Sequence, residues 1–155
     1  MLSIVEVEIR EALVGDLPHI LSLYSQPEMD DGMVLPLEQA EGILNRIKSY
    51  PDYNVYAAVY KQEIVGTFAL LIMDNLAHMG APSGIVEDVA VKRGMQGMGI
   101  GRQMMGFAMN VCRGKGCYKL VLSSNMKREK AHLFYEKLGF EKHGYSYWVG
   151  LKEQR

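Results

Sequence analysis

Hydrophobic and polar positions alternate at the start of the chain and then change to a helical spacing. Residues 4–9 alternate apolar with acidic side chains, which predicts a strand with one face in water. The sequence Asp-Leu-Pro at 16–18 is typical of an N-cap and a first helical turn, and that helix is expected to end near Pro27. A second helix is predicted over residues 37–49.

The rest of the chain alternates between strand and helix patterns. Residues 53–60 and 64–73 are rich in β-branched and aromatic side chains and predict a hairpin. The later predicted elements are a strand over 84–91, a helix over 99–113, a strand over 118–123, a helix over 128–138 and two terminal strands. This order combines an antiparallel hairpin with a β-α-β crossover. The predicted fold class is α+β: a mixed sheet of about seven strands with about four helices, in one domain over residues 1–155.

Composition and charge narrow the possible partners. The 155 residues include 17 basic and 18 acidic side chains, and a net charge of −1 gives no general attraction to nucleic acid or an anionic membrane. The start of the chain lacks the pattern of a secretory signal, and no apolar run reaches the length of a membrane span. We therefore expect a cytoplasmic protein. Cys112 and Cys117 have neither redox nor zinc-site spacing, so reduced thiols and no metal are expected.

A glycine-rich turn between a strand and a helix is the most informative segment. Residues 96–102 read Gln-Gly-Met-Gly-Ile-Gly-Arg. Glycines let the backbone approach a ligand closely, and the free N–H groups of a helix N-terminus favour phosphate oxygens. The alternative is that the glycines merely allow a tight connection. Neither the Walker nor the Rossmann spacing is present, so a different nucleotide-phosphate ligand is indicated.

Two blocks of sequence resemble the GNAT superfamily of N-acetyltransferases. Residues 96–101 match the family's Gln/Arg-x-x-Gly-x-Gly/Ala signature and follow an apolar strand that ends at 89–91. Ser-Ser-Asn at 123–125 and Ala-His-Leu-Phe-Tyr-Glu-Lys-Leu-Gly-Phe at 131–140 are similar to the family's fifth strand, its asparagine and the helix that follows. The resemblance implies a GNAT fold and an enzyme that moves an acetyl group from acetyl-CoA to an amine.

The resemblance also implies where acetyl-CoA binds. In the family, the amides of the glycine turn hold the pyrophosphate, and the pantetheine arm lies beside the fourth strand like an added strand. The expected cofactor-binding residues are Val89, Ala90, Val91, Gln96, Gly97, Met98, Gly99, Ile100, Gly101, Arg102 and Asn125. Asn125 could equally cap the helix that follows it.

The resemblance implies two catalytic side chains. Glu87 matches the position of a general base that acts directly or through water, although a solvated or salt-bridged strand residue is an equal alternative. Asp88 is the reserve candidate, because neighbouring strand residues point to opposite faces and should not share a role. Tyr135 matches the tyrosine that protonates the departing thiolate, or else it is a core residue. His132 is expected to be an ordinary helix side chain.

The acceptor is expected to be the primary amine of a small molecule. Residues 124–135 resemble bacterial small-molecule members of the family, including aminoalkylphosphonate acetyltransferases. The alternatives are a protein or peptide N-acetyltransferase and a non-catalytic acyl-CoA sensor. A homodimer is plausible at an exposed sheet edge.

Charged side chains offer two kinds of acceptor recognition. The acidic residues of the loop before the second helix, including Asp30, could attract a cationic amine. A phosphate- or phosphonate-bearing acceptor would instead need cations, for which the candidates are Arg10, Arg46 and Lys48.

Overall fold

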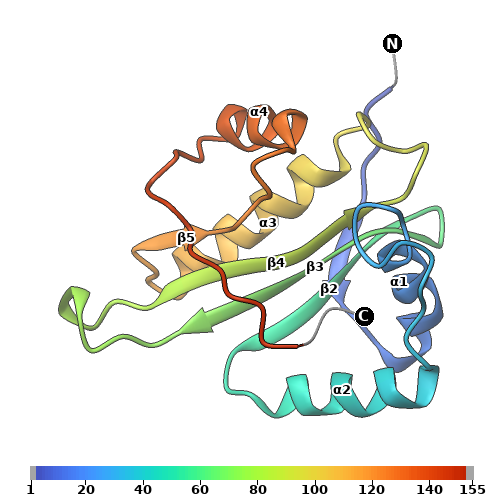
Figure 1. Ribbon diagram of the computed structural model, residues 1–155, viewed down its shortest axis with the longest axis horizontal. Helices are drawn as coiled ribbons and strands as arrows, with labels where there is room; N and C mark the ends of the chain where they lie inside the picture. Colours follow the sequence, from blue (N-terminus) through green and yellow to red (C-terminus); the bar gives the residue numbers. More distant parts are fainter. Residues whose placement is uncertain (1–2, 153–155) are drawn as a thin grey trace. The chain divides into compact units, whose positions relative to one another are not determined.

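The computed structural model describes residues 3–152, which belong to two compact units, Met1–Leu122 and Ser123–Arg155. Each unit is described by itself. The first contains β1 (Glu8–Glu11), α1 (Leu17–Tyr24), α2 (Leu37–Ser49), β2 (Tyr53–Tyr60), β3 (Glu63–Met73), β4 (Ser83–Val91), α3 (Ile100–Gly114) and β5 (Lys119–Val121). It also has two 3₁₀ turns, Val14–Asp16 and His78–Gly80. The second unit contains α4 (Glu129–Lys137) (Figure 1).

The five strands of the first unit form one mixed sheet in the order β1-β2-β3-β4-β5. Neighbours from β1 to β4 are antiparallel, and β5 runs parallel to β4. The β2–β3 hairpin closes through Lys61 and Gln62, which both have positive φ (47° and 65°), as a tight two-residue hairpin turn requires. The predicted α+β class, the hairpin and the β-α-β crossover are confirmed.

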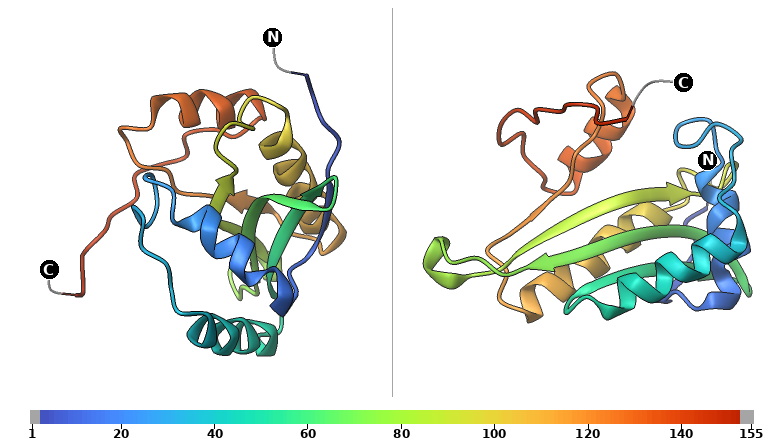
Figure 2. Two further views of the ribbon diagram at one scale, coloured as in Figure 1. Left: turned by 90° about the vertical axis from the view of Figure 1, so that its right-hand side faces the viewer. Right: turned by 60° about the horizontal axis from the view of Figure 1, so that its bottom comes forward.

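Helices cover both faces of this sheet (Figures 1 and 2). On one face, Phe68 of β3 lies 6.4 Å, centroid to centroid, from Phe107 of α3. On the other face, Ile20 and Leu23 of α1 pack with Ala57 of β2 in a buried cluster. Side chains at successive positions of a strand point to opposite faces of the sheet, so α3 covers one face and α1 and α2 cover the other.

The predicted apolar stripe of α3 forms the core beneath β3 and β4. Ile100, Met104 and Ala108 are at most 1% exposed, and each follows the previous one by a helical turn. Gly66 of β3 permits this packing, because a Cβ there would lie 2.8 Å from the Met104 sulfur. The close approach of α3 to β3 therefore depends on the absence of a side chain at Gly66.

Two features of the predicted sheet are wrong. The first strand was expected over residues 4–9, but the β1 ladder runs over Glu8–Glu11 and starts where Glu8 pairs with Val59. The sheet has five strands, not about seven, because residues 123–152 contain no strand. Tyr145 and Tyr147 are two residues apart, as side chains on one face of a strand are, but they are 87% and 92% exposed. Alternation without a hydrogen-bonded neighbour does not make a strand.

Candidate active site

The glycine turn before α3 presents free backbone amides. Gly97 and Gly99 have φ angles of 83° and 81°, the left-handed region that glycine tolerates. Gly99 is the N-cap of α3, and no side chain caps the helix. Within residues 3–152, the amides of Ile100, Gly101 and Arg102 have no backbone acceptor. Three N–H groups at the positive end of a 15-residue helix suit a phosphate group.

The edge of β4 is open next to this turn. β5 pairs with β4 over Ser83–Ile85 alone, so in the described part of the chain the rest of β4 has no strand on that side. The Lys92 amide donates to the Val65 carbonyl oxygen of β3. Because the backbone groups of successive strand residues point to opposite sides, the N–H and C=O groups of Val91 point toward the open edge. Ala90 pairs with Thr67, and its side chain is buried. An extended ligand arm could add to this edge as a strand does.

A β-bulge interrupts β4 at the predicted catalytic position. Ala90 pairs with Thr67 and Glu87 pairs with Ala69, so β4 has one more residue than β3 in this stretch. Asp88 takes up the extra length with a positive φ of 55°. The expectation that strand alternation separates Glu87 from Asp88 is therefore wrong, since the bulge lies between them and breaks the alternation.

Acidic and aromatic side chains gather around the bulge. Burial raises the pKa of Glu87, and the neighbouring Asp88 raises it further. Burial also raises the pKa of Asp88, and Asp30 from the loop after α1 adds to this rise. The pKa values of Tyr24 and Tyr53 are raised first by burial and then by Asp88. These five groups from α1, its following loop, β2 and β4 therefore share one electrostatic environment.

The loop after α1 is attached to the end of β4. Gln26 donates its Nε2–H groups to the carbonyl oxygens of Leu23 and Val91, at 2.9 and 3.2 Å. The Asp30 amide donates to the Tyr24 carbonyl oxygen at 2.9 Å, which folds the loop back onto the end of α1. These bonds hold an acidic residue of the loop near the strand that carries Glu87.

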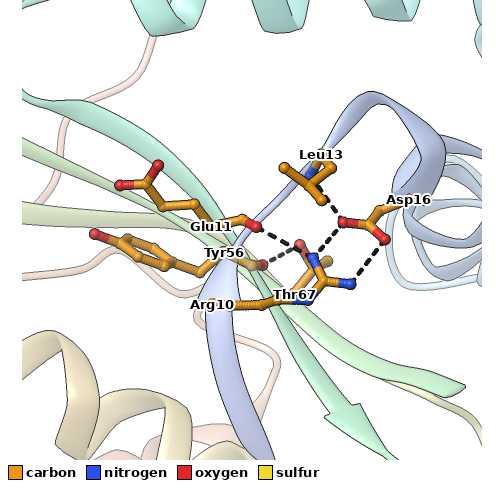
Figure 3. Close-up of polar contacts among 6 residues, drawn as sticks. All are labelled: Arg10, Glu11, Leu13, Asp16, Tyr56 and Thr67. Carbon is orange, nitrogen blue, oxygen red and sulfur yellow. Dashed lines mark hydrogen bonds and ion pairs between the residues drawn. The ribbon is translucent and has the colours of Figure 1, made fainter. Parts of the chain in front are cut away.

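Arg10, one of the three cations considered for an anionic acceptor, is already paired (Figure 3). The two terminal nitrogens of Arg10 donate to the carboxylate of Asp16 at 2.5 and 3.0 Å, and Asp16 also accepts the Leu13 amide at 2.8 Å. Asp16 was expected as the N-cap of α1, but its side chain makes no capping bond to that helix because Arg10 and Leu13 occupy its oxygens. Arg46 and Lys48 lie exposed on α2.

The second unit contains the other predicted catalytic side chain. Tyr135 of α4 is 9% exposed and packs edge-on against Phe134 and Phe140. Burial raises the pKa of Tyr135, while Arg128 acts weakly in the opposite direction. A phenol with a raised pKa stays protonated at neutral pH and can serve as an acid.

Asn125 and His132 interact with each other in the same unit. The Asn125 side-chain oxygen accepts the Lys127 amide at 2.9 Å, which forms a turn before α4. The His132 ring nitrogen Nε2 lies 2.8 Å from the Asn125 carbonyl oxygen. This contact agrees with a structural role for His132, and the Asn125 NH₂ group has no hydrogen-bond partner among residues 3–152.

Other features of the described residues limit the chemistry. Burial, with a smaller effect from Cys117, raises the pKa of the Cys112 thiol to about 12, so it stays protonated. In the described part of the chain, no cluster of three or more His, Cys, Asp or Glu side chains is arranged to hold a metal ion. None of the helices described is both long and apolar enough to cross a bilayer.

Comparison with known proteins identifies the family. The chain matches the Acetyltransferase (GNAT) family over residues 16–140, so it belongs to that family. The predicted resemblance is confirmed. The glucosamine 6-phosphate N-acetyltransferase of Trypanosoma brucei brucei is 40% identical over 80 residues, 52% of each chain, so the match spans about half of that relative's length.

Two further proteins are similar over larger parts of the chain. The aminoalkylphosphonate N-acetyltransferase of Salmonella typhimurium is 29% identical over 101 residues, 65% of each chain. The crystal structure of a transcriptional regulator from Bacillus halodurans C-125 superposes with a TM-score of 0.86 at 25% identity, and the match covers 94% of this chain and 100% of that one. The fold therefore extends well beyond the signature segments.

Proposed function

We propose that this protein moves the acetyl group of acetyl-CoA directly onto the primary amine of a small molecule. The observation that carries the proposal is the uncapped start of α3, which presents three free amides beside the open edge of β4. The family match over residues 16–140 draws on both units and supports their working as one acetyltransferase domain.

The chain has groups that could bind each part of acetyl-CoA, the acetyl donor. The amides of the glycine turn would hold the pyrophosphate, and the backbone of Val89 and Val91 would hydrogen-bond the pantetheine arm. The Val91 carbonyl oxygen already accepts one bond from Gln26, but a carbonyl oxygen has a second lone pair. Asn125, through its NH₂ group, would contact the same arm.

Acetyl transfer from a thioester to an ammonium group removes two protons from the nitrogen and supplies one to the sulfur. An amine is protonated at neutral pH, so the carboxylate of Glu87 would accept a proton from it, directly or through water, and leave a neutral nucleophile. The raised pKa of Glu87 brings this base closer to neutral pH. As the nitrogen bonds to the acetyl carbon and the carbon–sulfur bond breaks, the Tyr135 hydroxyl would protonate the departing thiolate. The second proton lost by the nitrogen would restore the tyrosine hydroxyl.

A small amine is favoured as acceptor. The two enzyme relatives compared act, by their names, on an aminosugar phosphate and on aminoalkylphosphonates. Asp30 and Asp88 would attract the ammonium group that such substrates share, whereas Arg10 is already neutralised by Asp16. The acidic surroundings of Glu87 therefore support recognition of the amine end of the acceptor.

Thiol release from acetyl-CoA tests the proposal. The panel would include glucosamine with and without a 6-phosphate, aminoalkylphosphonates, polyamines, amino acids and peptide N-termini, with calorimetric binding of CoA alongside. We expect turnover with a small amine. Turnover with peptides alone would identify a peptide acetyltransferase. Tight CoA binding without any turnover would identify a sensor, and absence of CoA binding would reject the role of the glycine turn.

A further inference from the structure

The first residues of the described chain lie against the glycine turn and are held there by one side chain of α3. Gln103 donates from Nε2 to the carbonyl oxygens of Val5, at 2.6 Å, and Gly99, at 3.1 Å. Its Oε1 accepts the Val7 amide at 3.1 Å, and the Val5 amide donates to the Met98 carbonyl oxygen at 3.1 Å. One carboxamide thus connects residues 5–7 to the turn.

These bonds fix two consecutive peptide planes of the turn. In a trans peptide the C=O and the following N–H point in opposite directions, and no cis peptide is present among the described residues. The bond from Val5 fixes the Met98 carbonyl and so aims the Gly99 amide to the opposite side. The bonds from Gln103 fix the Gly99 carbonyl and so aim the Ile100 amide in the same manner.

Packing adds to the hydrogen bonds. A Cβ on Gly99 would lie 3.1 Å from a methyl carbon of Ile4, so the apolar side chain of residue 4 fits against the bare glycine backbone. Glu6, between the two bonded residues, is exposed. The hydrogen bonds of this segment therefore come from alternate residues, Val5 and Val7, as in a strand, although they go to a side chain and a turn instead of a strand.

We propose that Gln103, together with residues 4–7, is a positioning element that orients the amides of Gly99 and Ile100 for the pyrophosphate of coenzyme A. The inference rests on the proposed function, because it assumes that this turn receives coenzyme A. Amides already aimed at an anion avoid the ordering that a mobile turn would undergo on binding. Gln103 acts through the turn and is not itself a catalytic residue.

Two pairs of variants separate this role from general stability. Gln103→Met keeps the length of the side chain but removes its three bonds, and its control is Asn110→Met on the exposed side of the same helix. Val5→Pro removes the amide that bonds Met98, and its control is Glu6→Pro, which removes an amide without a bonded partner among residues 3–152. Both members of each pair introduce the same residue.

Calorimetry with CoA and hydrogen exchange without it provide the readouts. We expect Gln103→Met and Val5→Pro to raise the Kd for CoA by about tenfold, and the controls to change it by less than about twofold. In steady state the KM for acetyl-CoA should rise while the KM for the amine stays unchanged. The Val7 amide should be protected from exchange in the wild-type protein and lose protection in Gln103→Met.

The outcomes distinguish this inference from the proposed function. Unchanged CoA affinity in both Gln103→Met and Val5→Pro would overturn the positioning role while leaving the proposed function intact. Failure of the wild-type protein to bind CoA would overturn both, even if Val7 protection showed that the contact exists. An equal loss of CoA affinity in Glu6→Pro and Val5→Pro would also overturn the positioning role, because the hydrogen bond to Met98 would then have no specific effect.

Discussion

Arg10 and Asp16 form a doubly hydrogen-bonded ion pair that connects β1 to the start of α1 (Figure 3). The bonds from Arg10 lower the pKa of Asp16, burial partly opposes them, and the Leu13 amide assists the lowering. The Asp16 side chain is 12% exposed, so solvent screens this pair less than a surface pair. The pair uses the charge of an arginine that would otherwise be available to an acceptor.

Asp16→Asn should therefore destabilise the fold. The substitution weakens bonds to a charged partner, and we expect a loss of about 1–3 kcal/mol in the free energy of unfolding near neutral pH. Because the folded-state pKa is lowered, the contribution of Asp16 is present above its unfolded pKa and is lost as pH falls through the folded value. Denaturant unfolding at several pH values should show the difference between variant and wild type shrinking in acid; a pH-independent difference would contradict this account.

The acceptor's charge provides a second test. Asp30→Asn removes one negative charge near Asp88, so the KM of a diamine should rise by about threefold or more. The KM of an amine that also carries a phosphate should stay the same or fall, since a repulsion is removed. Glu28→Gln, a change in the same loop, is the control. Equal effects of Asp30→Asn on both substrates would show that its charge does not select the acceptor.

The sequence predicted the elements whose signal is local. Helix α2 was predicted over 37–49 and found there, and the buried stripe of α3 follows the spacing of Ile100, Met104 and Ala108. Two terminal strands were also predicted, and the structure has none in residues 123–152. Alternation reports which side chains share a face, whereas a strand also needs a neighbour, which no local pattern supplies.

The candidate site was likewise predictable only where its sequence signal is local. The glycine signature marked the turn before α3, but no local pattern marked Gln103. Two of its three side-chain hydrogen bonds reach residues near the start of the described chain, and the third joins the turn itself. The β4 bulge was also missed, since Asp88 at φ 55° has no sequence signal comparable to a glycine. Contacts between distant segments decide both features.

Gly99→Ala should damage both stability and CoA binding. A left-handed residue with a Cβ costs about 1–2 kcal/mol, and this Cβ would also press on Ile4. Gly106→Ala is the matched control, because Gly106 lies inside α3 and a Cβ there would meet no heavy atom within 4 Å. It should stabilise the protein by about 0.5–1 kcal/mol. Similar unfolding curves for the two variants would contradict the strain assigned to Gly99.

Tyr135→Phe should slow turnover while the fold persists. Phenylalanine preserves the edge-on packing with Phe134 and Phe140 but removes the proton donor. We expect kcat to fall by about 10²-fold or more, the usual effect of losing one acid–base group. The KM for acetyl-CoA and the thermal unfolding midpoint should stay close to the wild-type values. A decrease of kcat by less than about twofold would make Tyr135 a packing residue.

Glu87→Gln and Asp88→Asn should have different effects on the pH profile. The folded-state pKa of Glu87 is raised, first by burial and then by Asp88, so kcat/KM in the wild-type protein should fall as pH drops through that raised value. Glu87→Gln removes the base, so the rate should drop by about 10²-fold or more and the acidic decline should disappear.

Asp88→Asn removes one of the charges that raise the pKa of Glu87 and keeps the base. Its acidic decline should therefore move to lower pH, with the rate near neutral pH largely retained. If instead Asp88→Asn abolishes turnover and Glu87→Gln leaves the pH profile unchanged, the base is Asp88. That result would be compatible with the bulge, because Asp88 lies in the same electrostatic cluster and its own pKa is raised by burial and by Asp30.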